Sequence, residues 1–156
     1  MKMMRYALVT AALLGAQSLM LSAPAAAADK VCKLDITGND QMQYDKKELT
    51  VAADCTQVQL TLKHAGKLPK EAMGHNWVLV KAADLTAVAN AGMTAGLPNS
   101  YIQAGDKRVI AHTKVVGGGE SDTITFPTTG LAGQSLMHLC TFPGHNALMR
   151  GTFKVG

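Results

Sequence analysis

The 156-residue chain has few aromatic and few charged side chains, which make up 4% and 17% of its residues. Its basic residues form no stripe with aromatic side chains between them, the pattern by which many proteins bind nucleic acid. No segment repeats along the chain, and no low-complexity linker divides it. The sequence therefore argues against nucleic-acid binding and favours one domain.

Long hydrophobic runs are also missing, apart from one at the amino terminus. Lys2 and Arg5 precede an apolar run over residues 6–21, and small residues follow over residues 22–28. This order is typical of a secretory signal peptide. A membrane anchor is the alternative, but the run is short for a span and lacks a stop-transfer pattern.

We therefore predict a signal peptide over residues 1–28, cleaved after Ala27 or Ala28, and one domain over residues 29–156. No membrane span is expected in the mature chain. Because the leader holds two of the 15 basic residues, the net charge falls from +4 in the full chain to about +2 in the mature domain.

Cysteine is scarce, with three residues in the chain. In an exported protein, three cysteines fit one disulfide plus one functional thiol. Cys140 lies among other candidate metal ligands, whereas Cys32 and Cys55 lie near the start of the mature chain. We therefore pair Cys32 with Cys55, which closes a loop of about 24 residues and should stabilise the fold by about 3 kcal/mol.

The mature chain has the pattern of short strands separated by turns. Apolar and polar residues alternate over residues 58–63, 123–126 and 152–155, and residues 77–80 form a compact apolar run. Glycine-rich turns separate these runs, for example at residues 117–119. Several short strands at this spacing predict a sandwich or barrel.

One interval, from Ala82 to Leu97, is typical of a helix instead. We expect Asp84 to cap its start and Gly92 or Gly96 to end it. The predicted helix is inserted between strands and packs outside the sandwich. Its apolar residues recur at the spacing of one helical face: Leu85, Val88, Ala89 and Met93.

Three metal-ligating residue types occur within ten residues of one another near the carboxyl terminus. They are Cys140, His145 and Met149, and a second imidazole, His75, lies some way upstream. Two histidines, one cysteine and a weak methionine form the ligand set of blue-copper electron-transfer sites. Thiolate and thioether suit Cu(I), while imidazole suits both oxidation states, so this set lets copper change charge with little movement.

Each of these residues also has a simpler interpretation. Cys140 alone could be an inert buried thiol, His145 a solvated loop residue and Met149 a core gap-filler. Zinc could occupy the same set, but methionine is a poor zinc ligand and zinc has no redox use. With four candidate ligands, no position is left for a substrate, which favours electron transfer over catalysis.

Four stretches of the chain resemble the azurins of the cupredoxin family. They cover residues 38–43, 73–79, 109–114 and 140–145, and they are more specific than a generic copper loop. The resemblance implies an all-β fold, an eight-stranded Greek-key cupredoxin sandwich or barrel with a short helical flap.

The resemblance also implies one type 1 copper per chain. It makes His75, Cys140 and His145 the equatorial ligands and Met149 a distant axial ligand. The backbone carbonyl of Gly74 is then a weak ligand on the opposite side.

Around these ligands, the resemblance suggests a supporting shell. The backbone amides of Asn76 and Phe142 are candidate donors to the Cys140 sulfur, and the Asn76 side chain can tie its segment to Thr141. Cys32 and Cys55 fall where azurins carry their disulfide.

An apolar collar is expected around the exposed edge of His145. Such a surface suits brief docking with redox partners such as c-type cytochromes or copper-containing reductases, because methionine surfaces adapt and carry no charge to desolvate. The collar positions are Met42, Leu68, Ala72, Met73, Met93, Phe142, Pro143, Ala147 and Leu148.

The other histidines are not expected to be ligands. His64 extends an alternating apolar face, so it is predicted to be a buried core histidine rather than a redox-coupled proton site. His138 and Leu136 stand where azurins usually have aromatic residues. His138 lies too far along its strand to join the ligand set without a bulge, and His112 is given no role.

Three functional classes compete. We expect a periplasmic blue-copper electron carrier that is not an enzyme. A copper oxidase or reductase would need a further copper site with additional histidines, which this chain does not offer. A copper-storage or delivery protein is the remaining alternative, and it would need exposed, exchangeable methionine or cysteine clusters.

Overall fold

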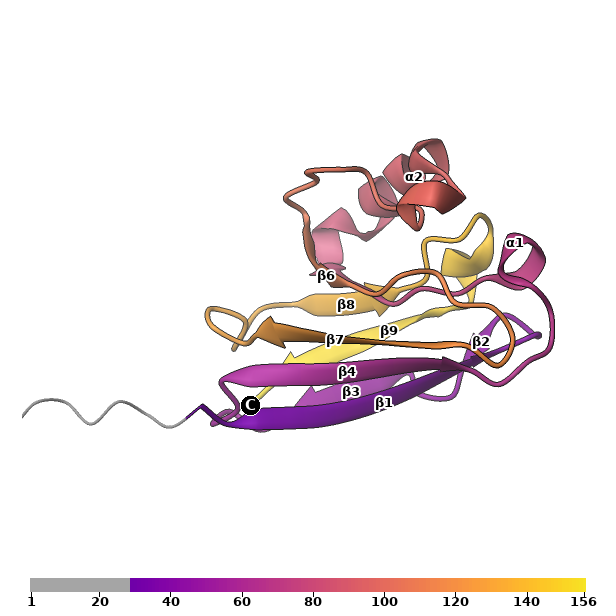
Figure 1. The fold of residues 1–156 in the computed structure, drawn as a ribbon. Helices are drawn as coiled ribbons and strands as arrows, with labels where there is room; N and C mark the ends of the chain where they lie inside the picture. The colour runs from indigo at the N-terminus through magenta and orange to yellow at the C-terminus, as the bar shows by residue number, and fades with distance from the viewer. Residues whose placement is uncertain (1–28) are drawn as a thin grey trace, which may run out of the picture.

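Two β-sheets face each other in this computed structural model, which describes residues 29–156 (Figure 1). The predicted leader over residues 1–28 lies outside the described residues. The first sheet has the strand order β2-β1-β4-β7, with β1 and β4 parallel and β4 and β7 antiparallel. Its strands are β1 (Val31–Asn39), β2 (Gln43–Tyr44), β4 (Gln57–His64) and β7 (Ser121–Pro127).

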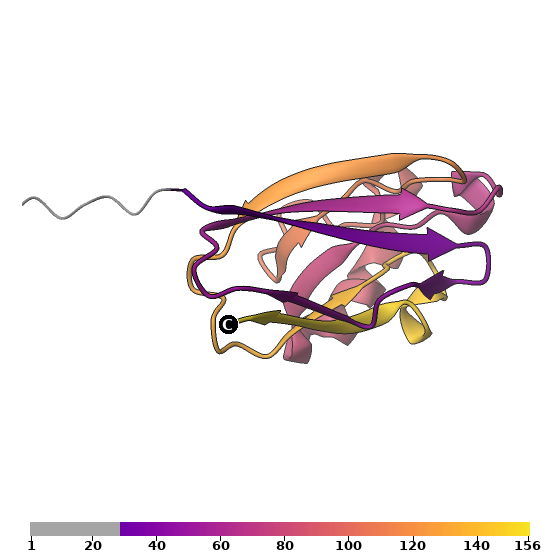
Figure 2. The ribbon, with the colours of Figure 1, turned by 90° about the horizontal axis from the view of Figure 1, so that it is seen from below.

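The second sheet has the order β3-β9-β8-β5-β6, and β3 pairs in parallel with the carboxyl-terminal strand. Figure 2 shows the indigo chain crossing from β1 in one sheet to β3, which lies beside the yellow β9 in the other. The strands of this sheet are β3 (Glu48–Val51), β5 (Val78–Lys81), β6 (Val109–His112), β8 (Leu136–Leu139) and β9 (Arg150–Val155).

The helical segments are short and lie outside the two sheets. Figure 1 shows α2 above the second sheet and α1 at one end of the sandwich. The α-helices are α1 (Lys70–Met73) and α2 (Leu85–Ala95), and the 3-10 turns are η1 (Ala82–Asp84), η2 (Leu97–Asn99) and η3 (His145–Ala147).

The core between the sheets follows from the alternation in the strands. Val58, Leu60 and Leu62 of β4 point inward and are fully buried, and each contributes roughly 1.5–3 kcal/mol of burial free energy. Trp77 lies among the buried aromatic rings, with its centroid 5.7 Å from that of Phe126 and 6.0 Å from that of Phe153. The predicted β-sandwich is confirmed, although residues 29–156 form nine strands where eight were expected; one of them, β2, has only two residues.

A smaller apolar cluster joins α2 to the outer face of β5. Leu85 and Val88 of the helix pack there against Val78 and Val80. The predicted inserted helix is therefore confirmed, and Gly96 ends it with a φ of +72°, a conformation that favours glycine. The expected capping by Asp84 is wrong, because its side chain makes no capping hydrogen bond.

A disulfide joins Cys32 in β1 to Cys55 just before β4, with 5.8 Å between the two Cα atoms. It ties together the amino-terminal ends of two parallel strands, and Cys140 is the free cysteine among the described residues. None of the helices in residues 29–156 has both the length and the apolar character that a membrane crossing requires.

Candidate metal centre

The candidate ligands come from two segments that the second sheet holds side by side. His75 forms an isolated β-bridge with Val116 just before β5, through backbone hydrogen bonds of 3.0 and 2.8 Å. Cys140 directly follows β8, the strand that pairs with β5. The chain then turns, and η3 places His145 over the same point.

Three donor atoms converge there. The Nδ1 atoms of His75 and His145 are 3.2 Å apart, and the Cys140 Sγ lies 3.8 Å from the His145 Nδ1. All three donors lie within 4.8 Å of one another, and each residue is buried. Two nitrogens at this separation can both lie about 2.0 Å from one metal ion.

The backbone of the β1–β2 turn sets the protonation of His75. Its Nε2 lies 2.8 Å from the carbonyl oxygen of Asn39, so this nitrogen carries the proton and Nδ1 is free to bind a metal. Gly38 permits this approach, because a Cβ there would lie 2.6 Å from the His75 Cδ2. Gly38 and Asn39 lie in the first of the stretches that resemble azurins, but their part in the site was not predicted from the sequence.

Burial favours the neutral form of both imidazoles, which is the form that binds metals. It lowers the pKa of His145 to about 4, helped by the neighbouring His75 and His64. The pKa of His75 is also lowered, mainly by burial, although the hydrogen bond to Asn39 opposes this effect.

The thiol needs a cation to lose its proton. Burial raises the pKa of Cys140 to about 12, although backbone N–H groups of Asn76 and Phe142 donate to the sulfur and lower it. A bound metal ion supplies the positive charge that makes such a thiolate stable at neutral pH. Two neutral imidazoles and one such thiol fit a type 1 copper centre.

Hydrogen bonds hold the two ligand segments together. The Asn76 side chain donates to the Thr141 hydroxyl at 2.7 Å and accepts from the Thr141 backbone N–H at 2.8 Å. It also donates to the carbonyl of Ser100 at 2.7 Å. The buried Tyr44 hydroxyl donates to the carbonyl of Asn76, a contact that was not predicted from the sequence.

Met149 and Gly74 flank the cluster. Met149 is fully buried; its backbone N–H donates to His145 at 2.7 Å, and its carbonyl accepts from Cys140 at 2.9 Å. The Met149 methyl group and the His75 ring both pack against Gly38. Gly74 must be glycine, because a Cβ there would lie 2.4 Å from the carbonyl oxygen of Lys70.

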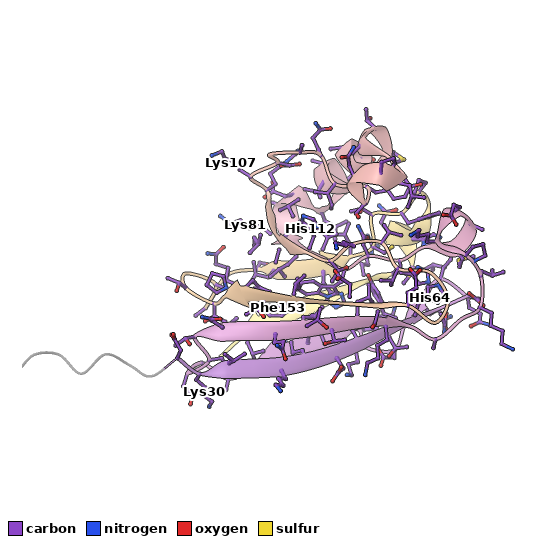
Figure 3. All side chains as sticks on the ribbon, in the orientation of Figure 1. Lys30, His64, Lys81, Lys107, His112 and Phe153 are labelled. Carbon is purple, nitrogen blue, oxygen red and sulfur yellow. A yellow bond between two sulfur atoms is a disulfide. The ribbon has the colours of Figure 1, made fainter. Side chains whose placement is uncertain are left out.

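The structure separates the remaining histidines. The His64 ring stacks on that of His75, with centroids 4.4 Å apart, and both its nitrogens have backbone partners, in Met73 and Gly66. It is the satisfied, buried histidine that the alternation predicts. His112 is exposed, and Figure 3 labels it and His64 in separate parts of the molecule.

His138 is fully buried but lies outside the ligand cluster. Its ring packs between Tyr44 and Trp77, with centroid distances of 5.5 and 6.0 Å. Neither ring nitrogen of His138 has a hydrogen-bond partner among residues 29–156. The Trp77 Nε1 also lacks a partner among these residues.

The collar residues lie on loops and short helices next to this cluster. Leu68, Met93 and Leu148 are 41%, 53% and 53% exposed, whereas His145 itself is only 3% exposed. The Phe142 ring covers His145 at a centroid distance of 4.5 Å. The His145 ring therefore exposes only a small edge beside these larger apolar side chains.

A sequence profile of the copper-binding proteins of the plastocyanin/azurin family matches residues 30–156. The chain belongs to this family. Within it, the azurin of Bordetella pertussis is 55% identical over 145 residues, which cover 91% of this chain and 95% of that protein. The azurin of Pseudomonas aeruginosa is 52% identical over 134 residues, which cover 85% and 89%.

A solved azurin structure supports the same relationship. The azurin Az-iso2 of Methylomonas sp. strain J superposes with a TM-score of 0.77 at 40% identity, covering 80% of this chain and 98% of that one. The resemblance to azurins that the sequence motifs indicated is confirmed, and copper is the metal that this family binds.

Proposed function

We propose that this protein is a periplasmic blue-copper electron carrier, which transfers one electron at a time and is not an enzyme. The observation that carries this proposal is the buried convergence of His75, Cys140 and His145, held by neighbouring backbone and side chains. A closed, braced ligand set favours electron transfer, because it leaves no position for a substrate.

In this proposal, copper bound here would alternate between Cu(I) and Cu(II). His75, Cys140 and His145 would hold it as strong ligands, and the Met149 thioether and the Gly74 carbonyl would be weak donors to it. Thioether and carbonyl donors at a distance adjust the relative stability of the two oxidation states without changing the geometry.

The supporting residues then have separate tasks. The backbone N–H groups of Asn76 and Phe142 donate to the Cys140 sulfur and so stabilise the thiolate. The reciprocal hydrogen bonds of Asn76 and Thr141 fix the distance between the two ligand segments. A braced site needs little rearrangement when the charge on the metal changes.

The apolar collar is the proposed docking surface for c-type cytochromes or copper-containing reductases. Its exposed aliphatic and thioether groups can contact a partner briefly, since few charges must be desolvated. The electron would pass through the His145 edge, the ligand nearest this surface. The predicted leader supports a periplasmic location for this exchange.

The spectrum of the copper-loaded protein tests the proposal. An electron carrier of this kind should absorb intensely toward the red end of the visible, with a narrow copper hyperfine splitting and a reversible one-electron potential. A colourless protein that gives up Cu(I) readily to a chelator would instead support copper storage or delivery.

A further inference from the structure

A cleft lies beside the apolar collar, between α1 and the segment that follows β6. Its volume is about 390 Å³, and neither its shape nor its charge was predictable from the sequence. It is lined by Lys70, Leu97, Pro98, Ser100, Lys114 and Val115.

Two ammonium groups, those of Lys70 and Lys114, border this cleft without a carboxylate partner among the described residues. The ion pairs among residues 29–156 use other cations, namely Lys30, Lys63, His64, Arg108 and Lys154. Two nearby acids are engaged by the backbone: Asp122 accepts from the Lys114 N–H at 2.8 Å, and Glu120 accepts from Gly117 at 2.9 Å. Glu71 is the exposed acid next to Lys70 in the sequence.

The walls of the cleft are fixed by close backbone packing. A Cβ on Gly117 would lie 2.7 Å from the Lys70 nitrogen, so the start of α1 rests directly on the segment after β6. On the other side, the Val115 N–H donates to the Ser100 hydroxyl at 3.2 Å. The two lysines therefore extend from a preformed frame with a buried apolar residue, Val115, at its base.

The cleft continues the surface already described. Lys70 begins the helix that carries Ala72 and Met73 of the collar. The Ser100 carbonyl accepts a hydrogen bond from Asn76, which is next to the ligand His75. An anionic group held here would lie at the margin of the collar.

We infer that Lys70 and Lys114 receive an acidic side chain of the redox partner, so that the favoured partner has a carboxylate beside its apolar contact surface. This inference rests on the proposed electron-carrier function. Free cations beside an apolar surface increase the rate of association with an acidic partner and orient it, while the collar makes the contact.

Binding can be tested without any electron transfer. The redox-inert trianion hexacyanochromate(III), added to the Cu(I)-loaded protein, should broaden the amide resonances of Lys70, Ser100, Lys114 and Val115 at low ionic strength. Broadening confined to other lysines would overturn the inference and leave the electron-carrier proposal intact.

The kinetic test uses one haem protein in two forms of opposite net charge. A basic cytochrome c and its acidic, succinylated form should each be reduced by the wild type, by Lys70→Gln/Lys114→Gln and by the control Lys81→Gln/Lys107→Gln. The control removes the same charge at a distance from the cleft. In Figure 3, Lys81 and Lys107 lie far from His64, and His64 marks the metal centre because its ring stacks on that of His75.

For the succinylated form, the cleft variant should lower the second-order rate constant about fivefold at low ionic strength, and the control less than about twofold. Both differences should vanish at high salt. With the basic form, the cleft variant should react no more slowly than the wild type. Equal slowing by the two double variants would mean that net charge alone matters, and the inference would be wrong. Unchanged blue absorption shows that each variant is folded.

Discussion

Two fully buried histidines, His75 and His138, lie in opposite circumstances. His75 has one nitrogen on a backbone carbonyl and directs the other at the ligand cluster. His138 lies between Tyr44 and Trp77 with neither nitrogen paired among residues 29–156. The same side chain is thus part of a functional site in one place and a polar group in an apolar core in the other.

The difference shows where this fold tolerates polar burial. Near the metal centre, hydrogen bonds already pair the buried polar groups, and a bound metal ion would further compensate for their desolvation. In the core, an unpaired buried donor or acceptor costs about 1–3 kcal/mol with no such compensation. His138 is therefore a position at which an apolar substitution should stabilise the sandwich.

The largest expected effect comes from removing the thiolate. Cys140→Ser should abolish the intense blue absorption and weaken copper binding at least about a hundredfold, because a hydroxyl is a poor substitute for a thiolate. Copper titration followed by visible absorption measures both. An intensely blue variant would show that the cluster around His75 is not the copper site.

The disulfide is expected to have the next largest effect. It joins the amino-terminal ends of β1 and β4, whereas the Asn39 carbonyl that contacts His75 lies at the other end of β1. Cys32→Ala with Cys55→Ala should lower the free energy of unfolding by about 2–5 kcal/mol and leave the blue spectrum nearly intact. Urea unfolding and visible absorption would be recorded on the same samples. A changed spectrum would mean that the two ends of the sandwich are coupled.

His138→Leu tests the comparison itself. It removes the two unpaired nitrogens with little change of volume, so the free energy of unfolding should rise by about 1–3 kcal/mol at pH 7. Urea unfolding at matched metal content measures the change. A loss of stability would mean that the imidazole has a favourable interaction in the core.

The difference in stability between the wild type and His138→Leu should increase as the pH falls. Burial, with a smaller contribution from the positive charge of Lys47, lowers the pKa of His138 from 6.5 to about 4. Between these values the unfolded chain binds more protons at this residue than the folded one, so wild-type stability falls as the pH falls from 6.5 to 4. The advantage of His138→Leu should therefore widen by roughly 3 kcal/mol over this range. A constant difference would contradict the lowered pKa.

The smallest effect is expected at the weak ligand. Met149→Leu should keep the blue colour and raise the reduction potential, because loss of a weak donor disfavours Cu(II). Voltammetry of the two proteins under one set of conditions would measure it. A marked fall in potential would argue against Met149 as an axial ligand.

The sequence predicted what depends on local spacing and alternation. The positions of Cys140, His145 and Met149 within one loop indicated the metal centre, and the alternation along residues 58–63 indicated the sandwich and the burial of His64. Strand limits were less accurate: the predicted run at 77–80 became Val78–Lys81, and α1 was not predicted.

What could not be predicted depends on contacts between distant segments. The hydrogen bond from His75 to Asn39 and that from Tyr44 to Asn76 join residues more than thirty positions apart. The lysine cleft likewise needs α1 to pack on Gly117. The sequence showed that a histidine stands at position 138, where azurins usually have an aromatic residue. That its nitrogens lack hydrogen-bond partners depends on how the surrounding segments place Tyr44 and Trp77 against it.

The position of β9 determines when this protein can finish folding. This strand follows all the other strands of residues 29–156 in the sequence, yet it lies inside the second sheet, between β3 and β8. During synthesis or export, β3 has no strand to pair with until residues 150–155 have emerged. Pairing over such a sequence separation is slow, because a long loop must close first. Until then, the unpaired edges of β3 and β8 must be kept from pairing with other chains. A truncation that removes only these six residues would therefore leave β3 without a partner in the second sheet.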